Sequence, residues 1–257
     1  MMNRARLFSL GLLLLLAPLL PAQAGKITTV SIGNAQIRLQ APDGFTEVGQ
    51  DSAEIMTRFT TFTPPSNKLL AVYVTDADAR RLRAGQQMEL NTYMMVQTHR
   101  QSLSTDMSPA EFNNLRDIIR GQQKELLERG RTQANELLKE RRSQISSQAG
   151  SDLNLTVEDM ALKGVFVDNE RIISLAAVNR YNVQSEGRPV SFEVAGASSV
   201  IHVRNKSLFV YVFEKYETNR NLENVRTLST VWGRQILRDN GVTDIITSPS
   251  GSRAPEV

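Results

Sequence analysis

The sequence predicts an α+β fold: an antiparallel sheet covered by helices as a sandwich, with a long helical insertion between strands. Strand-like segments fall into two groups, separated by a helical pattern at residues 105–150. Two strand-like runs, residues 69–74 and 208–213, are apolar on both faces, which is typical of strands covered on each side. No internal repeat or flexible linker interrupts the chain, so we expect residues 25–247 to form a single domain.

The first 24 residues have the pattern of a cleavable secretory signal. Arg4 and Arg6 precede an apolar run, and Ala22-Gln23-Ala24 supplies the small side chains that signal peptidase accepts. The run covers residues 7–20, which is shorter than the roughly 20 residues of a spanning helix. An uncleaved membrane anchor is the alternative interpretation. We expect cleavage after Ala24, a periplasmic location and no transmembrane segment in the mature protein.

Charge and cysteine content exclude several classes of function. Removing the signal takes two arginines from the 30 basic residues and leaves all 27 acidic ones, so the mature net charge is 28 − 27 = +1. A protein so close to neutrality has no general attraction to nucleic acid, and we expect no such partner. With no cysteine in the chain, disulfides and thiolate metal sites are impossible.

The N-terminal half begins with strand patterns. Residues 35–39 alternate as a strand does, and a proline–glycine turn follows at residues 41–45. Residues 56–62 are rich in threonine and phenylalanine, which favours a second strand. The doubly apolar run at residues 69–74 predicts a central strand. From Gly85 the spacing becomes helical, which predicts a helix over residues 88–103.

The predicted insertion is one long helix or a helical hairpin. Ser108 is placed as its N-cap and Pro109 as its first residue. The pattern continues to about residue 148, so an unbroken helix over residues 109–148 has a length of roughly 60 Å.

A narrow apolar stripe runs along this insertion. A stripe about two residues wide per heptad is typical of a coiled-coil seam, which indicates an arm that meets an envelope protein or a second copy of the chain. The alternative is a helix or helical hairpin folded back on its own sheet or on residues 88–103. The predicted partner-binding residues are Phe112, Leu115, Ile119, Leu126 and Leu137.

The C-terminal half returns to strand patterns and ends in a helix. The predicted strands are residues 164–167, 171–181, 190–194, 200–203 and 208–213. Asn205-Lys206 is the expected hairpin turn between the last two. Residues 221–239 carry an apolar stripe that includes Trp232, and we expect this helix to be part of the core. Residues 248–257 are polar and are expected to be a disordered tail.

Two features resemble the Mog1/PsbP-like domains of exported bacterial proteins. The motif Ala41-Pro42-Asp43-Gly44-Phe45 follows a short strand, and the apolar strand 208–213 precedes a closing helix with Trp232. The resemblance covers about residues 30–80 and 160–240. It implies binding or assembly roles more often than catalysis, and it supplies no catalytic residues.

No motif in the chain predicts a catalytic, cofactor or metal site. The two histidines, His99 and His202, lie on different predicted elements, and His202 is expected on an exposed face with Arg204. Ser198 lacks the second glycine of a nucleophile elbow. Asp78 belongs to a segment without the glycine and glutamate of a calcium loop. We therefore expect no cofactor and no stoichiometric metal.

Two classes of function stay open. The first is a non-catalytic periplasmic protein that binds a partner or assists envelope assembly. The second is a periplasmic hydrolase or small-ligand-binding protein whose site is assembled from scattered polar residues.

Overall fold

The computed structural model describes residues 26–185 and 188–242 of the chain. The predicted signal peptide and the predicted tail at residues 248–257 lie outside these ranges. The strands are β1 (Ile27–Ile32), β2 (Ala35–Gln40), β3 (Phe45–Glu47), β4 (Asn67–Thr75), β5 (Thr92–His99), β6 (Leu153–Asp168), β7 (Ile172–Ser185), β8 (Arg188–Val203) and β9 (Lys206–Lys215). The helices are α1 (Ala53–Thr60), α2 (Asp76–Arg83), α3 (Pro109–Gly121), α4 (Gln123–Glu140), α5 (Arg142–Ala149) and α6 (Asn219–Asp239), with a short 3₁₀ helix, η1 (Arg100–Leu103).

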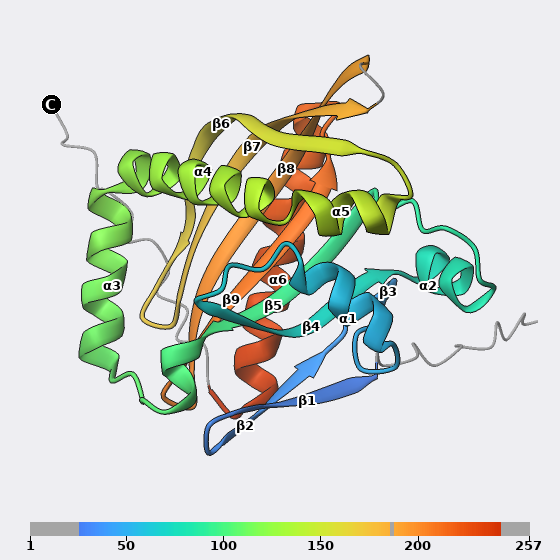
Figure 1. Cartoon of the computed structure of the whole chain (residues 1–257). Coiled ribbons are helices and arrows are strands. Elements are labelled where there is room, and N and C mark those ends of the chain that lie inside the picture. The colour runs from blue at the N-terminus through green and yellow to red at the C-terminus, as the bar shows by residue number, and fades with distance from the viewer. Residues whose placement is uncertain (1–25, 186–187, 243–257) are drawn as a thin grey trace, which may run out of the picture.

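Seven strands form one antiparallel sheet in the order β3-β4-β5-β9-β8-β7-β6, and β1 pairs with β2 in a separate hairpin. The hairpin and α6 cover one face of the sheet, which we call the α6 face. Helices α1, α3, α4 and α5 lie over the opposite face, which we call the α3–α5 face (Figure 1). The predicted α+β class, with helices covering an antiparallel sheet, is confirmed.

The main core lies between α6, the hairpin and the sheet. Trp232 of α6 is fully buried there, as predicted for the closing helix. Its indole Nε1 donates to the Gln40 carbonyl oxygen at 2.9 Å, and its ring meets the edge of Tyr73 with centroids 5.0 Å apart. These contacts join the helix, the β1–β2 hairpin and the sheet at one point.

The helical insertion is three helices rather than one. A capping box at Ser108 and Glu111 begins α3, which confirms the predicted start. The helix ends at Gly121, and Gln122 has a non-helical backbone before α4 begins. A second break at Arg141 separates α4 from α5. Because α3 runs across the direction of α4 (Figure 1), the expected 60 Å helix is wrong, and so is a simple hairpin.

Two N-terminal predictions of secondary structure are also wrong. Residues 56–62 were expected to form a strand but belong largely to α1, which Ser52 caps by accepting from the Ile55 backbone N–H. Residues 88–103 were expected to form a helix, but β5 occupies most of that stretch. Both faces of β5 are covered, so its apolar residues do not alternate and the strand period is hidden.

Helix α4 protects an exposed edge of the sheet. Among the described residues, the last strand, β6, has no neighbour on its outer side, and it carries three register shifts against β7. Asn135 of α4 donates to the Val157 carbonyl oxygen at 3.0 Å and accepts from the Val157 N–H at 2.8 Å. One side chain thus satisfies both backbone groups of an edge residue, which prevents that residue from pairing with another strand.

Candidate functional site

The apolar stripe of the insertion packs onto the sheet. Phe112 and Ile119 of α3 are buried in a cluster with Ile173 of β7, and Leu137 of α4 is also buried. Leu115 and Leu126 are partly buried against the α3 cluster. None of these five predicted partner-binding residues is an exposed side chain of a free arm. The packing corresponds to the alternative interpretation, a helical segment folded back on its own sheet.

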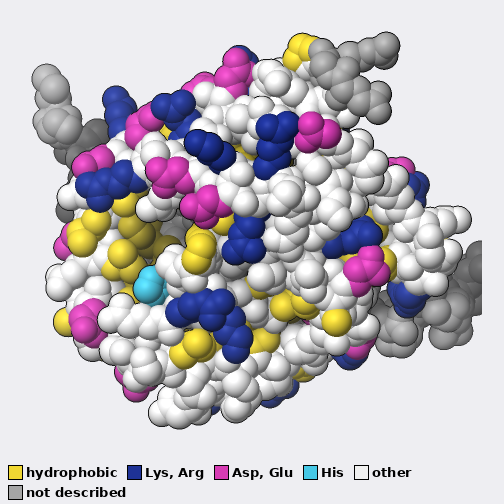
Figure 2. Space-filling view, in the orientation of Figure 1, with side chains coloured by type: hydrophobic (Ala, Val, Ile, Leu, Met, Phe, Trp, Pro, Cys, Tyr) yellow, Lys and Arg dark blue, Asp and Glu magenta, His cyan; other side chains and the backbone are white. Residues whose placement is uncertain are grey.

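The helices leave part of the sheet uncovered. Leu175, Val200 and Phe209 are half-buried although they lie on β7, β8 and β9, the inner strands of the sheet. Val200 pairs directly with Phe209 and with Ile173, so these side chains share the α3–α5 face. Figure 2 shows a hollow in this face beside α3 and below α4, with hydrophobic side chains gathered around it.

We call this feature the apolar hollow. We assign Leu175, Val200 and Phe209 to its floor, because they are half-buried and share this face in the sheet register. Leu115 and Leu126 are assigned to its side, because they pack in the same α3 cluster as Leu175 and Val200. Sequence reasoning placed 208–213 on a central strand covered on both sides, and it gave no sign that the cover is incomplete. The arrangement of helices decides which part of an apolar strand stays accessible, and no local pattern records that.

Neutral hydroxyl groups border the floor. Ser198 pairs with Leu175 and with Tyr211 in the sheet register, so both side chains lie on the hollow's face. Burial raises the pKa of Tyr211 to about 12, so its phenol is uncharged at neutral pH. This surface therefore suits an apolar or neutral group rather than an ion.

Helix α3 forms one side of the hollow, and besides its buried apolar contacts with Ile173 it is fixed at two places. Arg116 and Arg120 donate to Asp168 at the end of β6, at 2.6 and 2.9 Å. At the start of the helix, Phe112 stacks on the ring of His202 with centroids 5.3 Å apart. Ile118 on the outer side of the same helix is exposed.

His202 is buried, so the expectation of an exposed face shared with Arg204 is wrong. Arg204 and Asn205 both have positive φ and form the β8–β9 turn, so Arg204 is no longer on the strand. The His202 Nε2–H donates to the Met107 carbonyl oxygen at 2.8 Å, and Nδ1 lies 3.0 Å from Arg171 Nη1. The predicted turn at Asn205-Lys206 is shifted by one residue, and Lys206 is the buried first residue of β9.

The remaining polar candidates have structural roles. His99 Nδ1 accepts from the Gln101 N–H at the start of η1, with partners that differ from those of His202. Asp78 is buried and accepts from the backbone N–H groups of Glu89 and Leu90 at 2.8 and 3.2 Å. The carboxylate of Asp78 thus holds the chain after α2, as expected for a helix start rather than a calcium loop.

A chain of buried serines is the closest approach to a nucleophile cluster. Ser199 Oγ lies 2.6 Å from Ser174 Oγ and 2.8 Å from Ser229 Oγ, on the α6 face. The side-chain hydrogen bonds among Ser174, Ser199 and Ser229 join serine to serine and involve no general base of the kind that nucleophilic catalysis uses. In the part of the chain that the structure describes, no group of three or more acidic or histidine side chains is placed to hold a metal ion.

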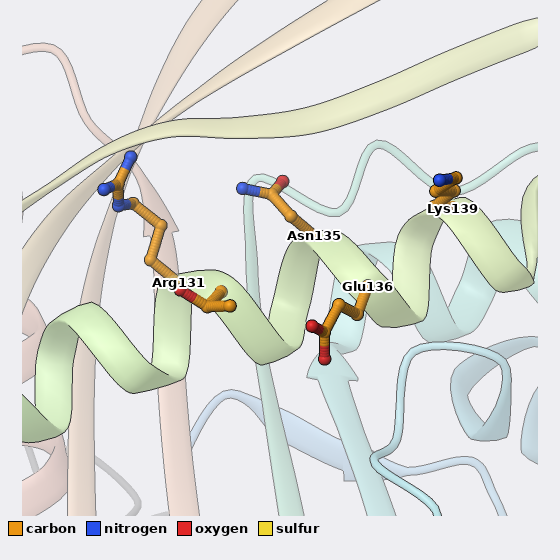
Figure 3. A pocket seen from close by; sticks show the side chains of 5 residues that line it. Arg131, Asn135, Glu136 and Lys139 are labelled. Carbon is orange, nitrogen blue, oxygen red and sulfur yellow. The ribbon is translucent and has the colours of Figure 1, made fainter.

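A shallow depression of about 320 Å³ lies along α4 (Figure 3). Arg131 and Asn135 point from the helix towards β6, and Glu136 lies on another side of the helix. Arg131 is already paired with Glu128 at 2.7 Å, and Asn135 is engaged with Val157. The depression is therefore part of the contact between α4 and the sheet edge.

The comparison with protein-family models, with curated proteins and with solved structures gives no match for this chain. The resemblance to Mog1/PsbP-like domains stays a prediction. Among residues 26–185 and 188–242, the helices are all too short or too polar to cross a membrane.

Proposed function

We propose that this protein is a non-catalytic periplasmic binding protein that captures an apolar group of an envelope protein partner in the apolar hollow. The observation that carries the proposal is the half-buried floor of Leu175, Val200 and Phe209 on inner strands of the sheet. The periplasmic location rests on the signal pattern that ends at Ala24. The proposed binding site therefore lies on the sheet rather than on the apolar stripe of the insertion, because the stripe packs onto the sheet.

The chemistry of the hollow supports binding. Apolar surface that a partner removes from water contributes about 25 cal/mol per Å². Tyrosine, tryptophan and arginine anchors often dominate binding energy, and Phe209 is the large aromatic side chain that we assign to the floor. Of the five stripe residues, Leu115 and Leu126 keep accessible surface beside the hollow and contribute to its wall.

A small neutral ligand is the second candidate occupant. The hydroxyl groups of Ser198 and Tyr211 border the floor and give a few polar contacts to an otherwise apolar site, which is typical of ligand pockets. A hydrolase has less support, because the buried serine chain lies on the other face of the sheet.

Site-specific photocrosslinking tests the proposed partner. A photoreactive amino acid in place of Phe209 is expected to give a crosslinked band with an envelope protein in cells that export the chain. The same amino acid in place of Gln133, which is exposed on α4, is the matched control and is expected to give no such band. Equal bands at both positions, or a band at position 133 alone, would contradict the assignment of the hollow. A small-molecule occupant gives no protein band but raises the thermal stability of the wild-type protein.

A further inference from the structure

We propose that the start of α3 is a lid at the side of the apolar hollow and that protonation of His202 releases it. The lid rests on the proposed binding function and extends it: the floor is accessible with α3 in place, and release of the start of the helix widens the hollow. The motion itself requires no partner and is measured without one.

The bonds of His202 require a neutral ring. A carbonyl oxygen only accepts, so the Met107 oxygen fixes a proton on Nε2. A guanidinium only donates, so Arg171 Nη1 requires an unprotonated Nδ1. A second proton on the imidazole places two donors opposite each other at 3.0 Å. Protonation therefore breaks the contact with Arg171 and puts a positive charge beside the guanidinium.

The surroundings of His202 contain cations but no carboxylate that bonds to the ring. Arg171 comes from the segment before β7. Lys206 of β9 pairs with Val203, so its side chain lies on the opposite, α6 face. It is held by Asp106, at 2.6 Å, and by the carbonyl oxygens of Ser102 and Thr105.

On α3, Arg116 is tied to Asp168. Glu111 in the first turn of α3 accepts from the N–H and the hydroxyl of Ser108. Burial, and after it the charge of Arg171, lowers the pKa of His202, although the hydrogen bond to Met107 raises it.

The direction of the effect follows from that lowered pKa. A group that is held neutral in the closed state stabilises that state above its free pKa of about 6.5. The stabilisation is lost as the pH falls below that value, because the open state takes up the proton more readily. The ratio of open to closed lid therefore rises between pH 7.5 and 5.0 by up to about 30-fold, the limit set by a free imidazole.

The start of α3 is the segment that this change releases. The entry to the helix is fixed by the Met107 carbonyl oxygen on His202 and by the Met107 N–H, which donates to the Asn205 carbonyl oxygen at 2.8 Å. Phe112 in its first turn stacks on the same imidazole. The second half of α3 stays in place, because Arg116 and Arg120 are paired with Asp168. Ile119 in the same half is buried against Ile173. The movement is therefore confined to the first turns of α3, and α4 stays bound to β6 through Asn135.

Energy transfer within the whole protein measures the lid. The chain has one tryptophan and no cysteine, so Trp232 serves as donor and a dye on Asn114→Cys, exposed on α3, serves as acceptor. We expect the transfer efficiency to fall reversibly between pH 7.5 and 5.0. The same dye on Gln133→Cys of α4 is expected to show no change, which separates lid movement from unfolding.

Substitutions assign the change to one ring. His202→Gln keeps an uncharged side chain and is expected to abolish the pH response, whereas His99→Gln, at the other histidine, is expected to retain it. A flat wild-type profile, or a wild-type response in His202→Gln, overturns the proposal. If His202→Gln does not fold, Arg171→Gln is read instead: it removes the facing cation, so a smaller pH response is expected and an unchanged one overturns the proposal. These results do not depend on whether the photoreactive amino acid at position 209 crosslinks to a partner.

Discussion

Replacing Trp232 with alanine is expected to lower the free energy of unfolding by about 3–5 kcal/mol, the usual cost of emptying a large buried aromatic site. The side chain is fully buried and joins three elements: α6, the β1–β2 hairpin through the Gln40 carbonyl oxygen, and the sheet through Tyr73. Its removal leaves a cavity and takes the donor away from the partly buried Gln40 carbonyl oxygen. Urea unfolding followed by far-ultraviolet circular dichroism gives the value.

The neighbouring residue supplies the control. Val231 is 53% exposed on the same helix, so Val231→Ala is expected to change stability by less than about 1 kcal/mol. A loss below about 1 kcal/mol for Trp232→Ala would mean that the indole is not part of the core.

Replacing residues 109–149 with a Gly/Ser linker is expected to abolish cooperative unfolding. The segment buries several apolar side chains that the sheet otherwise exposes to water. At about 2 kcal/mol each, they contribute about 10 kcal/mol, which is comparable with the whole stability of a typical domain. The edge strand β6 also loses Asn135 as its partner. The buried residues are Phe112, Ile119, Leu137, Leu138 and Ile145.

This result is the opposite of the one that the free-arm interpretation predicts. A free arm predicts that the sheet folds without the segment, because changing a loop's length alters stability only slowly. A matched control is Glu136→Ala on the exposed side of α4, which is expected to leave the unfolding midpoint unchanged. A deleted protein with a sharp transition near the wild-type midpoint would contradict the packing of the stripe on the sheet.

Strong local patterns predicted much of the fold correctly. The doubly apolar runs at residues 69–74 and 208–213 are inner strands, and the stripe around Trp232 belongs to a core helix. The N-cap at Ser108 is present as expected. Each of these patterns involves residues that are close together in the chain, and tertiary packing did not change the secondary structure that they predict.

The elements that the sequence predicted wrongly are those whose structure depends on contacts between residues far apart in the chain. Residues 56–62 have strand-forming composition, yet Ile55 and Phe59 lie one helical turn apart and are both buried against the sheet. The stripe of the insertion is as narrow as a coiled-coil seam, which suggested a coiled coil. Its width does not show that three separate helices lie over the same face of the sheet. His202 is buried by α3, which lies about 90 residues earlier in the sequence.

The hollow could not be predicted for the same reason. Phe209 and Val200 look like ordinary strand residues, and only the placement of α3 and α4 leaves them partly open. The central claim is that the stripe is interior and the hollow is accessible.

Cysteine labelling tests both halves of this claim in one measurement, since the chain has no native cysteine. Single variants Leu138→Cys and Phe209→Cys are treated with the same thiol reagent under native conditions. Position 209 is expected to react at once, and position 138 about a hundredfold more slowly, since it reacts only through local or global opening. Equal rates at the two positions, or faster reaction at position 138, would contradict the account.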